Sequence, residues 1–138
     1  GFIISREIYA LDKLNGLRVT YYLEGQGEDE EKMLTIENYK DSLLDGSFES
    51  FFMKGNIEKQ GNYIKGNKEG IWLIYNPDGQ LASKANYKND VLHGWSYAYN
   101  SKGAELKKLM FKNGTALLGE ELEKYLTFCE KNGIDPNN

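Results

Sequence analysis

Aromatic residues and glycines alternate with polar positions along this chain in a pattern that repeats every 24 residues. The repeated positions are Tyr39, Tyr63, Tyr87 and Phe111, then Gly46, Gly70 and Gly94, then Gly55, Gly79 and Gly103. The runs between the glycines have the length of strands and lack the period of a helix. A fixed period of this kind indicates that one supersecondary unit is stacked along the chain.

Each unit contains two turn signals. Residues 76–79 read Asn-Pro-Asp-Gly, as in a type I turn, and residues 100–103 repeat the signal without proline. A second turn falls between each repeated Tyr and the next Gly, as in residues 87–94. One period therefore holds two strands and two turns. This predicts a mainly all-β protein, an elongated antiparallel β-meander of about nine strands built from hairpin repeats of about 24 residues.

The pattern divides a single repeat domain, residues 1–138, into a degenerate repeat at 9–38 and three regular repeats at 39–62, 63–86 and 87–110. A partial repeat and a helix follow at 111–133. The first repeat is longer than the others because of an acidic insertion within residues 24–31. A cation site or a contact with a basic partner is conceivable there, but the spacing of a calcium loop is missing. We interpret the insertion as a solvated loop at a hairpin tip.

A C-terminal helix is predicted at about residues 120–131, where apolar side chains fall at i, i+3, i+4 and i+7. This stripe consists of Leu122, Tyr125, Leu126 and Cys129. Because a repeat array exposes an edge and an apolar face at its end, we expect the helix to cap the last strands. Asn132-Gly133 offers a left-handed stop, and residues 135–138 are expected to form a frayed tail.

The repeated residues resemble the MORN-repeat variant of bacterial antitoxin-like proteins. In the central repeat the matching residues are Tyr63, Gly70, Trp72, Tyr75 and Gly79. The repeat at 87–110 departs from the pattern, since Ser96 stands where the aromatic residue belongs and Trp95 lies one place earlier. The resemblance implies a non-enzymatic module that binds a protein partner, with a toxin as one candidate. The alternative that it implies is a structural scaffold associated with a membrane or the cell envelope.

Charge narrows the range of partners. The 138 residues carry a net charge of -4 and show no basic stripe, which argues against a nucleic-acid partner and against anionic lipid. No apolar run approaches the ~20 residues of a membrane span, so membrane association is disfavoured but stays open. The chain begins with Gly1 rather than Met, which indicates either a cloning remnant or the removal of a leader. The second case would place the protein outside the cytoplasm, and the sequence does not choose between the two.

Residues with catalytic potential are scarce. His93 is the single histidine, which excludes most catalytic triads and any site with several histidines. It occupies the turn position that Asn15, Asp45 and Glu69 hold in other units, so we interpret it as a polar turn residue. Cys129 lies on the apolar stripe and reads as a small core residue. We therefore expect no enzyme activity, no cofactor and no metal site.

Aromatic side chains are the one surplus, with 10 Tyr, 6 Phe and 2 Trp. Strand alternation places Phe48, Phe52 and Trp72 on one side of the sheet and most other large side chains on the opposite side. The candidate residues for partner binding belong to this second set: Tyr75, Trp95, Tyr97 and Tyr99. Packing within a thin sheet is the rival explanation of these rings. Trp95 is the sharpest candidate because it leaves the repeat register that Trp72 obeys.

Overall fold

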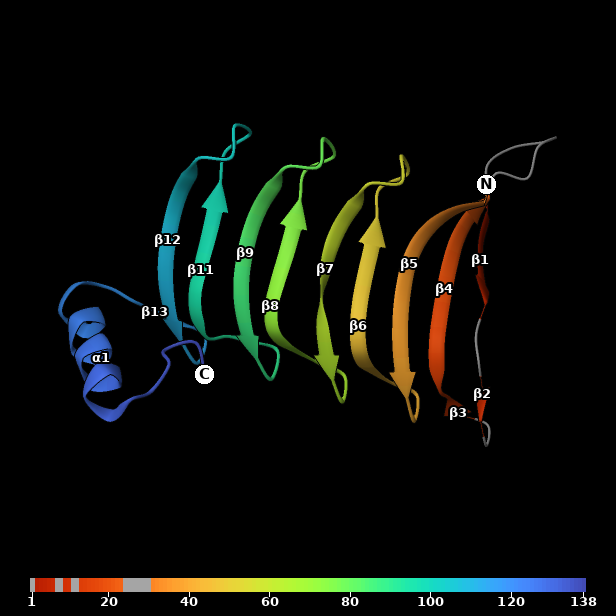
Figure 1. Ribbon diagram of the computed structural model, residues 1–138. Coiled ribbons are helices and arrows are strands. Elements are labelled where there is room, and N and C mark those ends of the chain that lie inside the picture. The colour runs from red at the N-terminus through yellow and green to blue at the C-terminus, as the bar shows by residue number, and fades with distance from the viewer. Residues whose placement is uncertain (1, 7–8, 11–12, 24–30) are drawn as a thin grey trace.

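The computed structural model describes residues 2–6, 9–10, 13–23 and 31–138. Its main body is an 11-stranded antiparallel sheet whose strands follow one another nearly in sequence order, and the helix α1 lies beyond the last of them (Figure 1). This confirms the predicted mainly all-β meander with a C-terminal helix. Residues 24–30 of the acidic insertion lie outside the described residues.

The strands in chain order are β1 Phe2–Arg6, β2 Tyr9–Ala10, β3 Lys13–Leu14, β4 Gly16–Leu23, β5 Glu31–Lys40, β6 Leu43–Phe51, β7 Ile57–Ile64, β8 Asn67–Tyr75, β9 Leu81–Lys88, β10 Val91–Leu92, β11 Gly94–Tyr99, β12 Glu105–Lys112 and β13 Thr115–Leu117. The main sheet runs β1-β4-β5-β6-β7-β8-β9-β11-β12-β13, with β10 beside β9, while β2 pairs with β3. It exceeds the expected nine or so strands because the short strands β10 and β13 also pair.

Two kinds of turn alternate along the sheet, one kind at each end of the strands (Figure 1). At the hairpin tips a glycine with positive φ donates its N–H to the carbonyl three residues earlier, as Gly79 does to Asn76 at 2.8 Å. At the other end of the strands the turns have two residues with positive φ, such as Asn89 at 50° and Asp90 at 67°. Two consecutive positive φ values match the right-handed twist of the strands. Both predicted turns of each unit are therefore present.

Successive units are tied together by side chains that accept a hydrogen bond from the first N–H of the next two-residue turn. The acceptors and donors are Asn15 Oδ1 and Asp41 N at 3.0 Å, Asp45 Oδ2 and Lys65 N at 3.1 Å, Glu69 Oε2 and Asn89 N at 2.9 Å, and His93 Nδ1 and Asn113 N at 3.3 Å. His93 is only 7% exposed. The position interpreted as a polar turn residue thus serves to stack one unit on the next.

The two sides of the sheet carry different side chains. On one side, which we call the aromatic face, ring contacts run from Phe48 to Tyr63, Trp72 and Tyr87, with centroid separations of 5.6, 5.0 and 6.5 Å. Trp72 is 3% exposed, and a Cβ atom at Gly61 would lie 2.2 Å from its ring. The backbone of β7 therefore needs glycine there. The opposite side we call the amide face, since strand alternation places Asn38, Asn62 and Asn86 on it.

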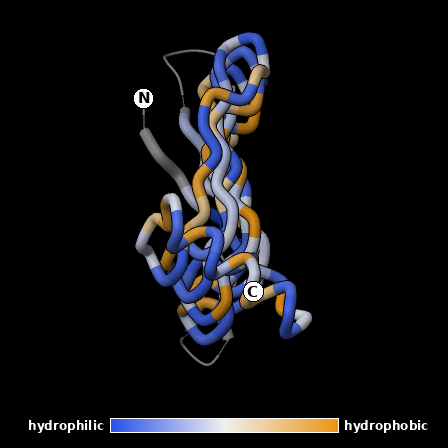
Figure 2. Tube along the Cα trace, turned by 90° about the vertical axis from the view of Figure 1, so that its left-hand side faces the viewer, coloured by the Kyte–Doolittle hydropathy of each residue, from blue (hydrophilic) through white to orange (hydrophobic). Residues whose placement is uncertain are grey.

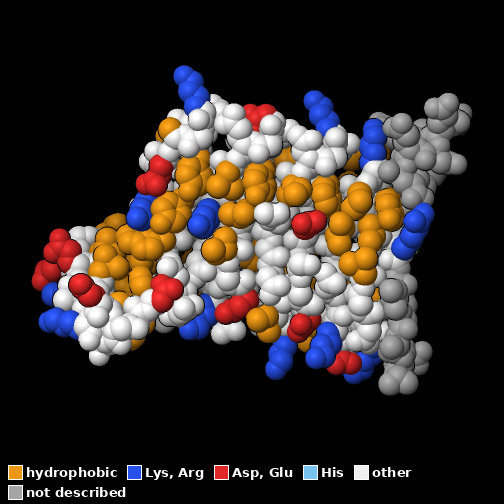
Figure 3. Space-filling view, viewed as in Figure 1, with side chains coloured by type: hydrophobic (Ala, Val, Ile, Leu, Met, Phe, Trp, Pro, Cys, Tyr) orange, Lys and Arg blue, Asp and Glu red, His pale blue; other side chains and the backbone are white. Residues whose placement is uncertain are grey.

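A single layer of strands buries few side chains. Seen from the α1 end, the sheet is thin and upright (Figure 2). Among the described residues the buried apolar side chains are Leu14, Trp72, Met110 and Cys129. A band of hydrophobic side chains crosses the strands on the face that Figure 3 shows. Much of the apolar surface of this sheet therefore remains accessible.

The helix α1 spans Gly119–Asn132 and ends where Gly133 takes a φ of 63°, with acidic residues in its first turn and a lysine in its last. These bounds agree with the predicted helix and its left-handed stop. Cys129 is buried, and the Lys112 ammonium of β12 lies 4.8 Å from the ring centroid of Tyr125. The helix thus meets the sheet at its β12 and β13 end.

Candidate functional site

Strand alternation puts the four predicted binding residues on the amide face. Tyr97 lies on β11 opposite Lys84 of β9 and Lys108 of β12. The rings of Tyr97 and Tyr99 stack with centroids 6.4 Å apart and planes 12° from parallel. Tyr75 is two strands away on β8, where its hydroxyl accepts a hydrogen bond from Gln60 Nε2 at 3.1 Å. The structure therefore groups the β11 rings and leaves Tyr75 at a distance along the same face.

Two lysines lie over the β11 rings. The Lys108 ammonium is 4.1 Å from the ring centroid of Trp95 and 5.4 Å from that of Tyr97. The Lys84 ammonium is 5.9 Å from the Tyr97 centroid. A cation over a ring face is attracted by the quadrupole of the ring. The three β11 rings are half-buried, so this part of the sheet offers both apolar and positively charged surface.

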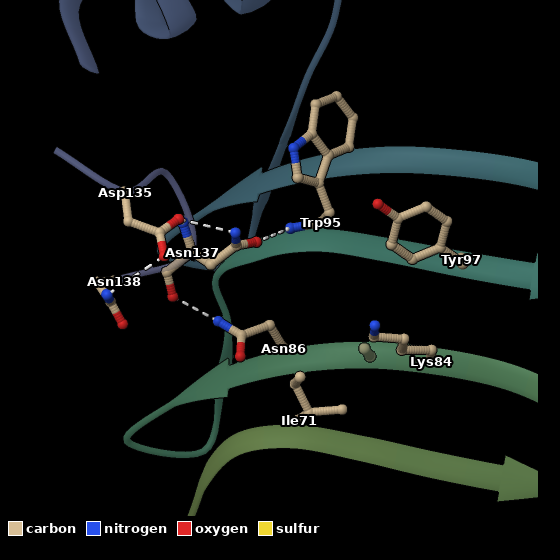
Figure 4. A pocket seen from close by; sticks show the side chains of 9 residues that line it. Ile71, Lys84, Asn86, Trp95, Tyr97, Asp135, Asn137 and Asn138 are labelled. Carbon is tan, nitrogen blue, oxygen red and sulfur yellow. Dashed lines mark hydrogen bonds between the residues drawn. The ribbon is translucent and has the colours of Figure 1, made fainter. Parts of the chain in front are cut away.

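A hollow of about 300 Å³ adjoins these rings on β8, β9 and β11 (Figure 4). Its walls include Ile71, Lys84 and Trp95, and residues of the chain after α1 close one end. Ile71 is 53% exposed, which leaves an aliphatic surface open in the hollow. The hollow is the concave part of the predicted contact surface.

The segment expected to be a frayed tail is instead bound to the sheet. Asn86 Nδ2 donates hydrogen bonds to the carbonyl oxygens of His93 at 2.7 Å and Asn137 at 2.5 Å. The backbone N–H of Trp95 donates to Asn137 Oδ1 at 3.1 Å (Figure 4). The prediction of a frayed end was wrong because these partners lie on strands far away in the sequence. Asp135 Oδ1 also accepts from Asn137 N at 2.9 Å, which holds the segment in a turn.

The absence of a side chain at Gly94 leaves room for this segment. A Cβ atom at position 94 would lie 2.7 Å from Asn137 Oδ1 and 2.8 Å from its Cα, whereas a Cβ atom at the equivalent Gly70 would meet nothing within 4 Å. Sequence reasoning identified Gly94 as a repeat glycine but missed Asn86 and Asn137. The asparagine that precedes each repeated Tyr, at positions 38, 62 and 86, was the available signal.

Groups with catalytic potential take structural positions. His93 joins successive turns, and Cys129 is buried. Burial is the main cause that raises the pKa of the Tyr39, Tyr63 and Tyr125 hydroxyls above 10.0, which keeps them protonated at neutral pH. Within the described ranges, no cluster of three or more His, Cys, Asp or Glu side chains is placed to hold a metal ion. In the same ranges no helix has the length and apolarity needed to cross a membrane.

Comparison with known protein families identifies one segment, which comprises most of β8 and all of β9. Residues 68–89 match the MORN repeat variant family. MORN repeats are in general non-catalytic modules that bind proteins or membranes. The matched MORN repeat contains Trp72, Lys84 and Asn86, and so contributes to both faces of the sheet. No curated protein matches the chain.

Proposed function

We propose that this chain is a non-enzymatic MORN-repeat module that binds a protein partner through the amide face around Trp95, Tyr97 and Tyr99. The observation that carries the proposal is the group of half-buried β11 rings beside the 300 Å³ hollow, with Lys108 4.1 Å from the Trp95 ring centroid. Tyr and Trp rings bury a large area at a small cost in side-chain entropy, and they dominate the binding energy of many interfaces.

The partner class follows from the charges on this surface and from the resemblance of the repeats. Lys84 and Lys108 favour a partner with acidic groups next to its apolar contact. The repeats resemble those of bacterial antitoxin-like proteins, which makes a toxin the candidate partner. Tyr75 lies on the same face and would contact only a partner large enough to reach across β9.

The test compares two variants that change opposite faces. Tyr97→Ala removes a β11 ring from the amide face, and the matched control Ile74→Ala shortens a 41% exposed side chain on the aromatic face. Immobilised wild-type protein and both variants are used to capture partners, and captured proteins are identified by mass spectrometry. We expect wild type and Ile74→Ala to retain the same protein and Tyr97→Ala to lose it, with affinity lower by about tenfold or more.

Thermal melting of the same samples separates binding from folding. All three proteins should melt within a few degrees of one another, because neither side chain is buried. A partner that Tyr97→Ala captures as well as wild type does would overturn the proposed surface. Flotation with phospholipid vesicles tests the membrane-associated alternative, and vesicle binding that depends on Tyr97 would favour that alternative over a protein partner.

A further inference from the structure

The row of contacting rings on the aromatic face, formed by Phe48, Tyr63, Trp72 and Tyr87, we call the aromatic ladder. It has a gap at one repeat position. Positions 48, 72 and 96 are equivalent in the 24-residue period and hold Phe, Trp and Ser. Ser96 lies on β11 opposite Leu109 of β12, on the aromatic face. Phe48 and Trp72 fill this position with rings that contact the repeated tyrosines. Ser96 leaves the corresponding space without a ring.

A hollow of about 240 Å³ occupies that place. Its walls on the aromatic face include Ala85, Tyr87, Ala98, Leu109 and Phe111. Tyr87 is the last ring of the ladder, 6.5 Å from Trp72, and in the described part of the chain no ring contact joins it to Phe111. The hollow therefore lies between two rings of the ladder, bounded by small and aliphatic side chains, and we call it the Ser96 slot.

The polar groups at the Ser96 slot indicate what kind of side chain it suits. Ser96 Oγ is buried and has no hydrogen-bond partner. A buried hydroxyl without a partner is unfavourable, so a ligand that offers an N–H or O–H group there gains a hydrogen bond. The indole of Trp72 shows the same need in its own position, since its Nε1 donates to the Asn62 carbonyl at 3.2 Å.

Lysines supply the charge around the slot. Lys107 lines the hollow on the aromatic face, and no acidic side chain lines it. Next to it, the Lys68 ammonium lies 4.8 Å from the Trp72 centroid and 5.0 Å from the Tyr87 centroid. This local positive charge contrasts with the net charge of -4 of the whole chain. Charge complementarity therefore favours an occupant with carboxylates beside its ring.

We propose that the Ser96 slot binds the indole ring of a tryptophan in an acidic segment of a protein partner. The partner's indole completes the ladder between Tyr87 and Phe111 and donates its N–H to Ser96 Oγ, while flanking carboxylates meet Lys107 and Lys68. Ring packing of this geometry stabilises the ladder where the chain supplies its own ring. The slot lies on the face opposite the β11 rings discussed above, so it does not depend on the function proposed for the amide face.

The experiment measures binding of a synthetic peptide, Ac-Asp-Glu-Trp-Glu-Asp-NH2, by isothermal titration calorimetry and by amide chemical shifts. The matched peptide has Ala in place of Trp. We expect the Trp peptide to bind at least about tenfold more tightly than the Ala peptide, and to shift the amides of Tyr87, Leu109 and Phe111. Equal affinity of the two peptides, or shifts confined to α1, would overturn the proposal.

Three substitutions of the protein locate the site. Ser96→Phe places a ring of the chain's own in the slot, so it should abolish peptide binding and raise the melting temperature. Ser101→Phe makes the same change at an exposed hairpin tip and should leave peptide binding unchanged. If Ser96→Phe does not fold, Lys107→Glu tests the slot at an exposed position and should weaken binding of the Trp peptide by about tenfold. Full peptide affinity in a folded Ser96→Phe variant, or in Lys107→Glu, would contradict the assignment.

Discussion

The repeats at 63–86 and 87–110 share a backbone pattern but direct their tryptophans to opposite sides of the sheet. Trp72 points to the aromatic face and is almost wholly buried between Tyr63 and Tyr87. Trp95 lies one position earlier in its repeat and points to the amide face, beneath Lys108. Because side chains alternate across a strand, a shift of one residue moves a ring from one face to the other.

This difference changes the surface of the last repeat, next to the end of the array. The shift empties the aromatic position at Ser96 and places apolar groups on the amide face instead. Met110 stands where the earlier repeats have an asparagine, and it is fully buried. Trp95 stands where the central repeat has Ile71. The amide face thus becomes apolar next to α1 and the segment that follows it, which need a surface to pack on.

The largest difference should come from the tryptophans themselves. Trp72→Ala removes a buried ring that contacts three others, so the free energy of unfolding should fall by about 3–5 kcal/mol. Trp95→Ala removes a half-buried ring at the surface and should cost about 1–2 kcal/mol. Denaturant unfolding followed by circular dichroism measures both values. Equal losses would mean that Trp95 is a core residue like Trp72 and not a surface available to a partner.

Alanine substitutions at the equivalent glycines should also lower stability by different amounts, but the difference should be smaller than that between the two tryptophan variants. Gly70 and Gly94 both have positive φ, at 72° and 90°, so alanine at either position is strained and should cost about 1 kcal/mol. At Gly94 the new methyl group also displaces Asn137, and the hydrogen bond from Trp95 N is lost. We expect Gly94→Ala to cost on the order of 1 kcal/mol more than Gly70→Ala.

Melting temperatures of the two variants give this order, and removal of residues 135–138 provides the control. In the shortened protein the two substitutions should have similar effects, because the displaced asparagine is absent. A difference that persists after the shortening would place the cause elsewhere than in Asn137.

The link between successive turns should give a smaller effect. His93→Ala removes the acceptor for Asn113 N, so the free energy of unfolding should fall by about 1–2 kcal/mol. His93→Asn supplies an amide oxygen of the kind that Asn15 uses for Asp41 N, and it should recover part of that loss. Because both replacement side chains are smaller than histidine, comparing the two variants separates the effect of losing the hydrogen-bond acceptor from the effect of losing side-chain volume. Identical stability of the two variants would exclude a stabilising role for the hydrogen bond.

The smallest effect concerns the ladder at alkaline pH. Burial is the first cause that raises the pKa of the Tyr63 hydroxyl above 10.0, and the charges of Asp90 and Glu37 add to it. A raised pKa in the folded state means that the associated stability is present below pH 10 and is lost as the pH rises through the folded value. Tyr63→Phe keeps the ring without the ionisation, so its unfolding midpoint should fall less above pH 10 than that of wild type. Parallel curves for the two proteins would refute this contribution.

The sequence was most informative where structure depends on neighbouring residues. The hairpin tips follow from local turn chemistry, as at Asn76-Pro77-Asp78-Gly79, and the bounds of α1 follow from its apolar stripe and from Gly133. Strand alternation correctly separated Phe48 and Trp72 from Trp95 and Tyr97. The use of Tyr97 and its neighbours for binding stays a prediction.

The parts that the sequence did not reveal depend on residues far apart in the chain. The pattern identified position 93 as a polar turn position but gave no reason for its burial, which comes from the turn of the next unit. It identified Ser96 as a departure, and only the packing of β9 and β12 around it shows that the departure leaves a hollow. The asparagine before each repeated Tyr attracted no attention because an amide has many possible partners.

The sequence by itself determined the period of this protein, the alternation of its faces and the positions of its turns, since each depends on contacts within one hairpin. The tertiary structure alone decided that the segment after α1 binds to the sheet and that the ladder has a gap at Ser96. Asn86 and Asn137 are 51 residues apart, and nothing in the local sequence of either specifies the other. Their hydrogen bond exists because the stacked strands and the helix bring the two residues to the same place. The walls of the Ser96 slot come together for the same reason.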